Sequence, residues 1–197
     1  MLTPTLSSPS DLLNKLEREF WRALHHKHHL HKSDHFYNFC VTSNALKDYF
    51  FEWKKILPTN AGAEQKKSFY EVWNTVPELV AATEIANTMK HFVLRDRQGN
   101  PKMSQARVVR KARSTVVHVF LKPDGALKAV RDRNHLSITI EMATGQRFKL
   151  YEFMDAVLGY WRKFLLAEGV PIRGQSATEL YGAEAQRLRS LRGSAKV

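Results

Sequence analysis

Apolar residues recur at steps of three and four along most of the chain, which is the spacing that places them on one face of a helix. The pattern predicts helices over residues 10–28, 33–56, 68–74, 77–95 and 151–168. Ser10 is expected to cap the first helix, because a serine side chain accepts a hydrogen bond from an N–H group that the first turn leaves without a partner. Residues 58–66 carry Pro, Asn and Gly and no apolar stripe, so we expect a loop there.

Between residues 107 and 150 the spacing changes to two, which is the period of a strand with one buried face. Apolar and polar residues alternate most clearly from Leu136 to Met142. Pro123-Asp124-Gly125 and Thr144-Gly145 are residue types typical of tight turns. We therefore expect a small antiparallel β-meander at about residues 106–150, before the last core helix. The expected fold class is mainly α with a β insertion (α+β), a four-helix up-down bundle that carries this meander.

The length of 197 residues suits a single domain. We expect a flexible lead-in over residues 1–9, one domain over 10–168 and a basic tail, partly helical or disordered, over 169–197. Cys40 is the only cysteine, so no disulfide can form within the chain, which fits a reducing compartment. The first nine residues lack signal-peptide features and no apolar run is long enough to span a bilayer. A cytoplasmic location without a membrane partner is expected.

Lysines and arginines exceed acidic residues by 12, and this excess is concentrated in one part of the chain. Residues 95–133 contain eleven Lys or Arg and three Asp, which is two thirds of the excess. Positive charge gathered on one surface attracts polyanions and releases their counterions on binding. We therefore expect nucleic acid or an acidic protein as the partner. The candidate nucleic-acid-binding residues are Arg95, Arg97, Arg107, Arg110, Lys111, Arg113, Arg131 and Arg133.

Strand alternation predicts where some of these charges lie. Arg107, Lys111 and Arg113 share parity, so they are expected on one face of the sheet. The alternative is a solvated basic surface that keeps an edge strand from pairing with another chain. Neither zinc-finger spacing nor an aromatic RNA-recognition pattern is present, so sequence-specific readout is not expected. G-x-G-x-x-G, G-x(4)-G-K-[ST] and G-x-S-x-G are also absent, which argues against nucleotide hydrolysis and hydrolase chemistry of those classes.

A polar stripe interrupts the helix expected over residues 77–95. Glu84, Asn87 and His91 follow one another at steps of three and four, so they share a face. Buried polar groups cost free energy unless they are hydrogen-bonded. The stripe is therefore either a satisfied internal network or one wall of a site. In a site, Asn87, Lys90 and His91 are the candidate catalytic residues, with His91 as acid or base and Lys90 binding an anion.

Six histidines lie between residues 25 and 35. Three interpretations stay open: solvated or structural side chains at a helix end, a functional cluster, and a site for a divalent metal. His25 and His29 are four apart and share a face if the helix continues. The segment does not match H-E-x-x-H, and no carboxylate stands at the corresponding position. We assign no metal and no cofactor.

A helical bundle in which Arg or Asn is followed a few residues later by His resembles the HEPN superfamily (higher eukaryotes and prokaryotes nucleotide-binding). Arg22 with His28 has the spacing R-x(4–6)-H, with His26 in the same stretch, and Asn87 with His91 has a slightly shorter spacing. The resemblance implies a metal-independent ribonuclease of toxin–antitoxin or phage-defence systems, in which two copies pair around one cleft. The alternative catalytic residues are then Arg22, His26 and His28. The segment 85–91 also resembles bacterial proteins with no assigned activity.

These observations favour a basic binding module that engages a polyanion, namely RNA, DNA or an acidic protein. The first alternative is the HEPN-like ribonuclease. The second is a regulatory protein-interaction component of a mobile element or defence system. Whether the chain is an enzyme, and whether it forms a homodimer, follows from neither composition nor periodicity.

Overall fold

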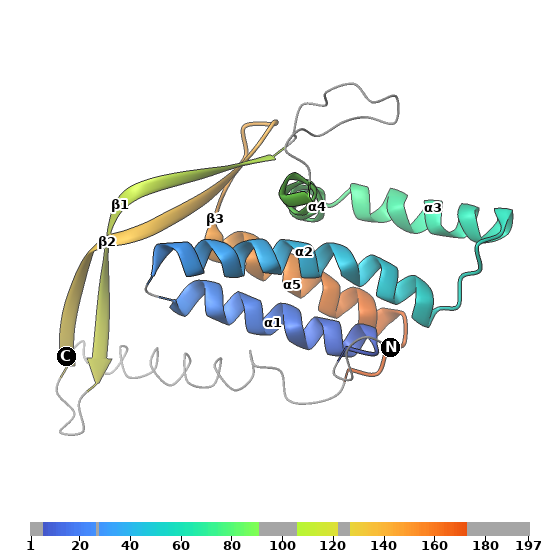
Figure 1. Cartoon of the computed structure of the whole chain (residues 1–197), viewed down its shortest axis with the longest axis horizontal. Coiled ribbons are helices and arrows are strands. Elements are labelled where there is room, and N and C mark those ends of the chain that lie inside the picture. The colour runs from blue at the N-terminus through green and yellow to red at the C-terminus, as the bar shows by residue number, and fades with distance from the viewer. Residues whose placement is uncertain (1–5, 27, 91–105, 122–126, 173–197) are drawn as a thin grey trace, which may run out of the picture.

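The structure is a computed structural model that describes residues 6–26, 28–90, 106–121 and 127–172 (Figure 1). At positions 29, 89, 90, 109–121 and 127–137 it describes the backbone alone. The described residues form helices α1 (Pro9–His25), α2 (His29–Trp53), α3 (Asn60–Asn74), α4 (Pro77–Lys90) and α5 (Leu150–Ala167) and strands β1 (Ala106–Leu121), β2 (Leu127–Met142) and β3 (Arg147–Lys149). The strands form one antiparallel sheet in the order β1-β2-β3. The expected mainly helical α+β class with a small antiparallel meander is confirmed.

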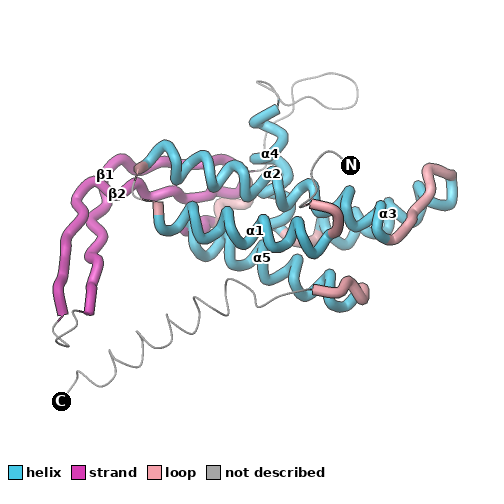
Figure 2. Tube along the Cα trace, turned by 60° about the horizontal axis from the view of Figure 1, so that its bottom comes forward, coloured by secondary structure: helices cyan, strands magenta, loops and turns pink. Residues whose placement is uncertain are grey.

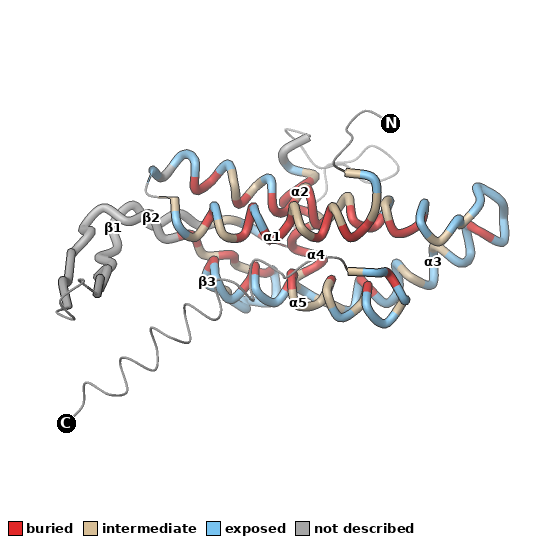
Figure 3. The backbone as a smooth tube through the Cα atoms, turned by 90° about the horizontal axis from the view of Figure 1, so that it is seen from below, coloured by how far each residue is buried: buried red, intermediate tan, exposed pale blue. Residues whose placement is uncertain are grey.

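The helices enclose the core. Figure 1 shows α1, α2 and α5 stacked side by side, and α4 crosses close to α2. Lys15 contacts Thr42 while Glu19 contacts His35, so α1 and α2 run in opposite directions. The buried positions of these helices face one another (Figure 3). None of the helices in the described ranges is both long and apolar enough to cross a membrane.

An aromatic cluster joins α2, α3 and α5. The Phe50 ring lies 5.0 Å from that of Phe69 and 4.9 Å from that of Phe164, and the Trp73 ring lies 5.5 Å from that of Trp161. Such edge-on and tilted pairs add to the free energy that burial of the rings supplies. The indole N–H of Trp161 donates to Ser43 Oγ at 2.8 Å, so this buried donor is satisfied. The cluster explains why the second half of α3 is fixed against the bundle.

The sheet is joined to the helices through one of its faces. Ile138 and Ile140 of β2 are buried in the core, and Phe148 of β3 packs against it. The buried Glu84 carboxylate of α4 accepts a hydrogen bond from the backbone N–H of Ala106 at 3.2 Å, which fixes the start of β1. The opposite face of the sheet is therefore left to solvent.

Two expected helix starts were wrong. The N-cap of α1 is Ser8, whose side chain accepts from the Asp11 N–H at 3.2 Å, and Ser10 is a buried residue of the first turn. The Asp11 carboxylate accepts in return from the Ser8 hydroxyl, a bond that lowers the pKa of Asp11. The second helix starts at His29, four residues before Ser33. Helix α2 thus begins inside the histidine segment.

The loop expected over residues 58–66 was wrong in most of its length. Helix α3 starts at Asn60, and its N-cap is Thr59, whose hydroxyl accepts from the Gly62 N–H at 3.1 Å. The first half of this helix is almost entirely exposed, so it carries no apolar stripe that periodicity detects.

We expect Gly62→Ala to lower the free energy of unfolding by about 1–3 kcal/mol. Alanine normally favours a helix over glycine by about 1 kcal/mol. At Gly62, however, a Cβ collides with the backbone carbonyl oxygen of Leu57, so the turn before α3 must shift. Urea unfolding followed by circular dichroism measures the change.

Gly159→Ala is the matched control. Gly159 lies inside α5, and a Cβ there meets nothing within 4 Å. The same substitution should therefore raise stability by about 0.5–1 kcal/mol. Equal effects of the two substitutions would contradict the assigned collision at Gly62.

Candidate anion-binding surface

One cross-strand row on the solvent face of the sheet carries two arginines and one glutamate. Arg107 of β1 pairs in register with Glu141 of β2, and Glu141 pairs with Arg147 of β3. Directly opposed residues of neighbouring strands lie close enough for their side chains to interact. Arg107 donates to Glu141 Oε2 from Nε at 2.7 Å and from Nη2 at 2.6 Å. Arg147 Nε contacts Glu141 Oε1 at 2.8 Å, so each carboxylate oxygen is bound to one arginine.

The three side chains differ sharply in exposure. Arg107 and Arg147 are 76% and 70% exposed, whereas Glu141 is 12% exposed. The hydrogen bond from Arg107 is the main cause that lowers the pKa of Glu141, and the charges of both arginines add to it. The glutamate is therefore ionised at neutral pH and holds both guanidinium groups, which remain accessible to solvent. Two positive charges against one negative leave the row with a positive excess.

A small cavity lies beside this row. Its volume is about 310 Å³, near the lower end of the range for ligand sites. The tight turn between β2 and β3 closes one side of it: Gly145 has φ +86°, and its N–H donates to the carbonyl of Met142 at 2.9 Å. This turn was expected from Thr144-Gly145, and it brings β3 back beside β2. The cavity is lined by Ala106, Arg107, Glu141, Met142, Ala143, Gly145 and Arg147.

The next row of the same face adds a lysine. Lys149 of β3 pairs in register with Thr139, two residues from Glu141, so it shares the face of Arg147. Its ammonium group lies 3.8 Å from Glu152 Oε1 at the start of α5, and the lysine side chain is 83% exposed. Glu152 also accepts from the backbone N–H of Lys149 at 3.1 Å. The solvent face of the sheet therefore carries Arg107, Arg147 and Lys149 around one glutamate.

The parity argument for the basic strand residues holds only in part. Arg107 and Lys111 stand at positions of equal parity in an unbroken register. The register shifts between Lys111 and Ser114, so parity alone no longer places Arg113 with them, and its place on this face stays a prediction. Arg110 occupies a position of the opposite parity, paired with the buried Ile138.

The remaining predicted charges are described incompletely or not at all. The backbone places Arg110, Lys111, Arg113, Arg131 and Arg133 in β1 and β2. Arg95 and Arg97 lie outside the described residues. Sequence reasoning missed Arg147 and Lys149, which follow the basic span. Their alternation around Phe148, after a turn signal, was the available indication.

The polar stripe of α4 is described up to Asn87. Glu84 is bound to the Ala106 N–H, as in the internal-network interpretation, and Asn87 is half-buried. Lys90 ends α4 with only its backbone described, and His91 lies outside the described residues. The catalytic assignment of Asn87, Lys90 and His91 therefore stays a prediction.

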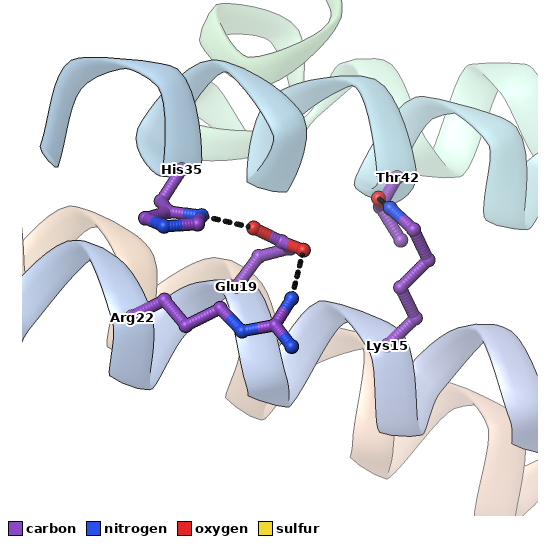
Figure 4. Close-up of polar contacts among 5 residues, drawn as sticks. All are labelled: Lys15, Glu19, Arg22, His35 and Thr42. Atoms are coloured by element: carbon purple, nitrogen blue, oxygen red, sulfur yellow. Dashed lines mark hydrogen bonds and ion pairs between the residues drawn. The ribbon is translucent and has the colours of Figure 1, made fainter. Parts of the chain in front are cut away.

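A second polar cluster lies where α1 meets α2 (Figure 4). The buried carboxylate of Glu19 contacts Arg22 Nη1 at 3.0 Å and His35 Nδ1 at 2.8 Å. Figure 4 shows Arg22 and His35 approaching Glu19 from different helices. Lys15, one turn earlier on α1, donates to Thr42 at 2.6 Å, and burial lowers its pKa.

The histidine rings gather next to this cluster. His26 lies 4.8 Å from His31 and 5.7 Å from His35, between ring centres, and His28 lies 5.1 Å from His31. Arg22 and His26 are thus linked through Glu19 and His35. Arg22 forms its ion pair with Glu19. Among the described residues no three His, Cys, Asp or Glu side chains converge to hold a metal ion. Cys40 is buried, and burial raises the pKa of its thiol, as expected of a core residue.

Comparison of the chain with models of protein families, with curated proteins and with solved structures finds no match.

Proposed function

We propose that this protein is a basic binding module for a polyanion and that the solvent face of its sheet is the binding surface. The observation that carries the proposal is the arginine pair Arg107 and Arg147, held around Glu141 and exposed to solvent beside a cavity. An arginine presents planar donors that match the oxygens of phosphate and carboxylate groups. Because the carboxylate fixes both guanidinium groups, less conformational entropy is lost when they bind an anion.

Polyanion binding predicts a defined dependence on salt. We expect the double variant Arg107→Gln/Arg147→Gln to bind a labelled 30-nucleotide probe, double-stranded DNA or single-stranded RNA, about tenfold or more weakly than the wild type. Each arginine that neutralises one phosphate contributes a little under one unit to the slope of log K against log salt. The slope should therefore fall by about 1–2 in the variant. Fluorescence anisotropy between 50 and 200 mM salt measures both quantities.

The control variant removes the same charge elsewhere. Lys67 on α3 and Lys163 on α5 are exposed and lie on helices away from the sheet face, so Lys67→Gln/Lys163→Gln should keep most of the affinity and the slope. A polyglutamate probe distinguishes an acidic protein from nucleic acid as the partner. The proposal fails if the wild type binds none of these probes at 50 mM salt, or if both double variants weaken binding equally.

The HEPN-like ribonuclease is the second candidate, and one observation favours it. Arg22 and His35 share the Glu19 carboxylate, with His26 in ring contact with His35, so a fixed cation and several acid–base groups occupy one corner. We expect cleavage of single-stranded RNA in the presence of EDTA, lost in His26→Ala and His35→Ala. If His91→Ala abolishes cleavage and the other two substitutions do not, the polar stripe of α4 is the catalytic site. If the wild type cleaves no RNA, the ribonuclease is ruled out.

The broader expectations belong to the same proposal. We infer that residues 10–168 are one domain and that α1, α2 and α5 belong to the expected four-helix up-down bundle, with α4 packed across α2 (Figure 1). The cytoplasmic location, the homodimer and a regulatory role in a mobile element or defence system remain predictions. Equilibrium sedimentation of the full chain tests the homodimer directly.

A further inference from the structure

The β1–β2 hairpin is much longer than the sheet that anchors it. Strand β3 pairs only with Thr139, Ile140 and Glu141, at the inner end of β2. Beyond Lys111 and Ser137 the two strands of the hairpin pair with no other strand of the described residues. We call residues 112–121 and 127–136 the outer hairpin. Figures 1 and 2 show the turn end of the hairpin standing clear of the helices. The described helices therefore leave the backbone at the turn end uncovered.

The hairpin also changes direction where the outer hairpin begins. The register shifts between Lys111 and Ser114, and again between Ser114 and Val116. Such bulges bend a ribbon and increase its twist, and the bend is visible in Figure 1. The outer hairpin continues from the part of the sheet that carries Arg107 and Arg147, which stand opposite Glu141, four positions from the Lys111–Ser137 pair where the outer hairpin starts. A partner that follows the ribbon towards the body thus reaches the anion-binding surface.

The dimensions of the outer hairpin match a groove of a double helix. Ten residues per strand extend about 33 Å at about 3.3 Å per residue, which is roughly one turn of B-form DNA at about 34 Å. The major groove of B-form DNA is about 12 Å wide and admits a two-stranded β-ribbon. A ribbon fixed at one end by a folded body can lie in the groove while the body contacts the backbone.

The charge of the hairpin is complementary to phosphate. Strands β1 and β2 contain seven Lys or Arg against two acidic residues, Asp132 and Glu141. Four of the basic residues belong to the outer hairpin: Arg113, Lys128, Arg131 and Arg133. A net positive ribbon flanked by two rows of phosphates in a groove gains from both strands of a duplex.

Composition distinguishes a duplex from a single strand. Proteins that bind single strands stack successive bases on several aromatic side chains, and Phe120 is the one Phe, Tyr or Trp in the two strands. The major groove of A-form RNA is deep and too narrow for protein elements to read. We propose that the outer hairpin inserts into a groove of double-stranded DNA, while Arg107 and Arg147 bind its phosphates at the base of the hairpin. This inference rests on the proposed polyanion binding and names its ligand.

The test shortens the hairpin and leaves the anion-binding surface in place. Lys111 and Ser137 are paired in register, so residues 112–136 can be replaced by Asn-Gly, the two-residue turn that strand twist favours. We expect this variant to bind a 30-base-pair DNA duplex at least about tenfold more weakly than the wild type. Thermal unfolding of the helices by circular dichroism confirms that the variant folds.

A charge variant keeps the test decisive if the shortened chain does not fold. Arg131→Gln/Arg133→Gln should weaken duplex binding and lower its salt slope, whereas Lys67→Gln/Lys163→Gln should not. The wild type should also prefer the DNA duplex to single-stranded DNA and to double-stranded RNA of equal length. The inference would be overturned if both hairpin variants bound the duplex as tightly as the wild type does. Equal affinity of the wild type for the three nucleic acids would overturn it too. The proposed function would then stand or fall separately, on the variant Arg107→Gln/Arg147→Gln.

Discussion

Arg162→Met should lower the free energy of unfolding by about 3–5 kcal/mol, the largest loss that we expect from one substitution. Arg162 of α5 forms an ion pair with Glu17 of α1. The Glu17 side chain is 2% exposed, whereas that of Arg162 is 27% exposed. Removal of the arginine charge leaves a buried carboxylate without this cation, and burial of an ion away from its counter-charge costs several kcal/mol. Methionine retains most of the apolar stem of arginine. The loss of unfolding free energy therefore comes from the missing charge and not from lost packing.

The reverse substitution and the double variant test this explanation. Glu17→Met should cost less than Arg162→Met, because the partly exposed guanidinium group can be hydrated from solvent. The double variant Glu17→Met/Arg162→Met should regain most of the stability, since a well-packed apolar pair often replaces a buried ion pair at little cost. Urea unfolding of the four proteins gives the coupling free energy. A loss below about 1 kcal/mol in Arg162→Met would contradict a structural role of this pair.

Periodicity found the helices because their buried faces are apolar, and it failed where burial does not produce a pattern. Helix α3 was recognised from Phe69 to Trp73, the part that packs into the aromatic cluster. Its first half is exposed and depends on the Thr59 cap, which is a local hydrogen bond with no hydrophobic signal. The cap of α1 was expected at Ser10, and it is Ser8. The hydrogen bonds between Ser8 and Asp11 decide between them.

The candidate site depended on register, which a single sequence specifies weakly. Charge counting found the basic span and Arg107. It did not find that Glu141 and Arg147 complete the row, because these contacts join residues 34 and 6 positions from Glu141 across two strand pairs. The face of Arg113 depends on register in the same way, since a bulge adds a residue to one strand and changes parity beyond it. Composition therefore predicted the sign of the charge on this surface. Strand pairing determined which side chains lie on it.

Buried charge is the feature of this core that periodicity predicted least. Phe39 and Phe50 of α2 are fully buried, as apolar residues of a core helix. Lys47 lies between them in the sequence and is also buried, with 6% of the residue exposed. Its ammonium group donates to Thr83 Oγ1 of α4 at 2.7 Å and lies 5.8 Å from the centre of the Tyr70 ring. The lysine joins α2 to α3 and α4 through contacts that no linear pattern indicates.

Lys47→Met should raise the free energy of unfolding at pH 7 by about 1–2 kcal/mol, the largest gain that we expect. Burial lowers the pKa of Lys47 from 10.5 to about 8, partly offset by the charge of Asp48. A shift of this size corresponds to about 3 kcal/mol of unfavourable free energy for the charged form in the folded protein. Methionine removes that penalty and keeps contact with the rings, while the bond to Thr83 and the cation–π attraction are lost.

The pH dependence identifies the cause of this gain. Between pH 8 and 10.5 the folded protein has released the Lys47 proton and the unfolded chain still binds it, so wild-type stability rises with pH in this window. The advantage of Lys47→Met should therefore shrink between pH 8 and pH 10.5 and reverse above it, where Lys47 is neutral in both states and its amine still donates to Thr83. Urea unfolding at pH 7 and pH 10 measures the difference between the two proteins, in which other titrating groups cancel. Lys67→Met, at an exposed position, is the control for the loss of one lysine charge. A difference for Lys47→Met that is the same at pH 7 and pH 10 would show that burial does not shift the pKa of Lys47.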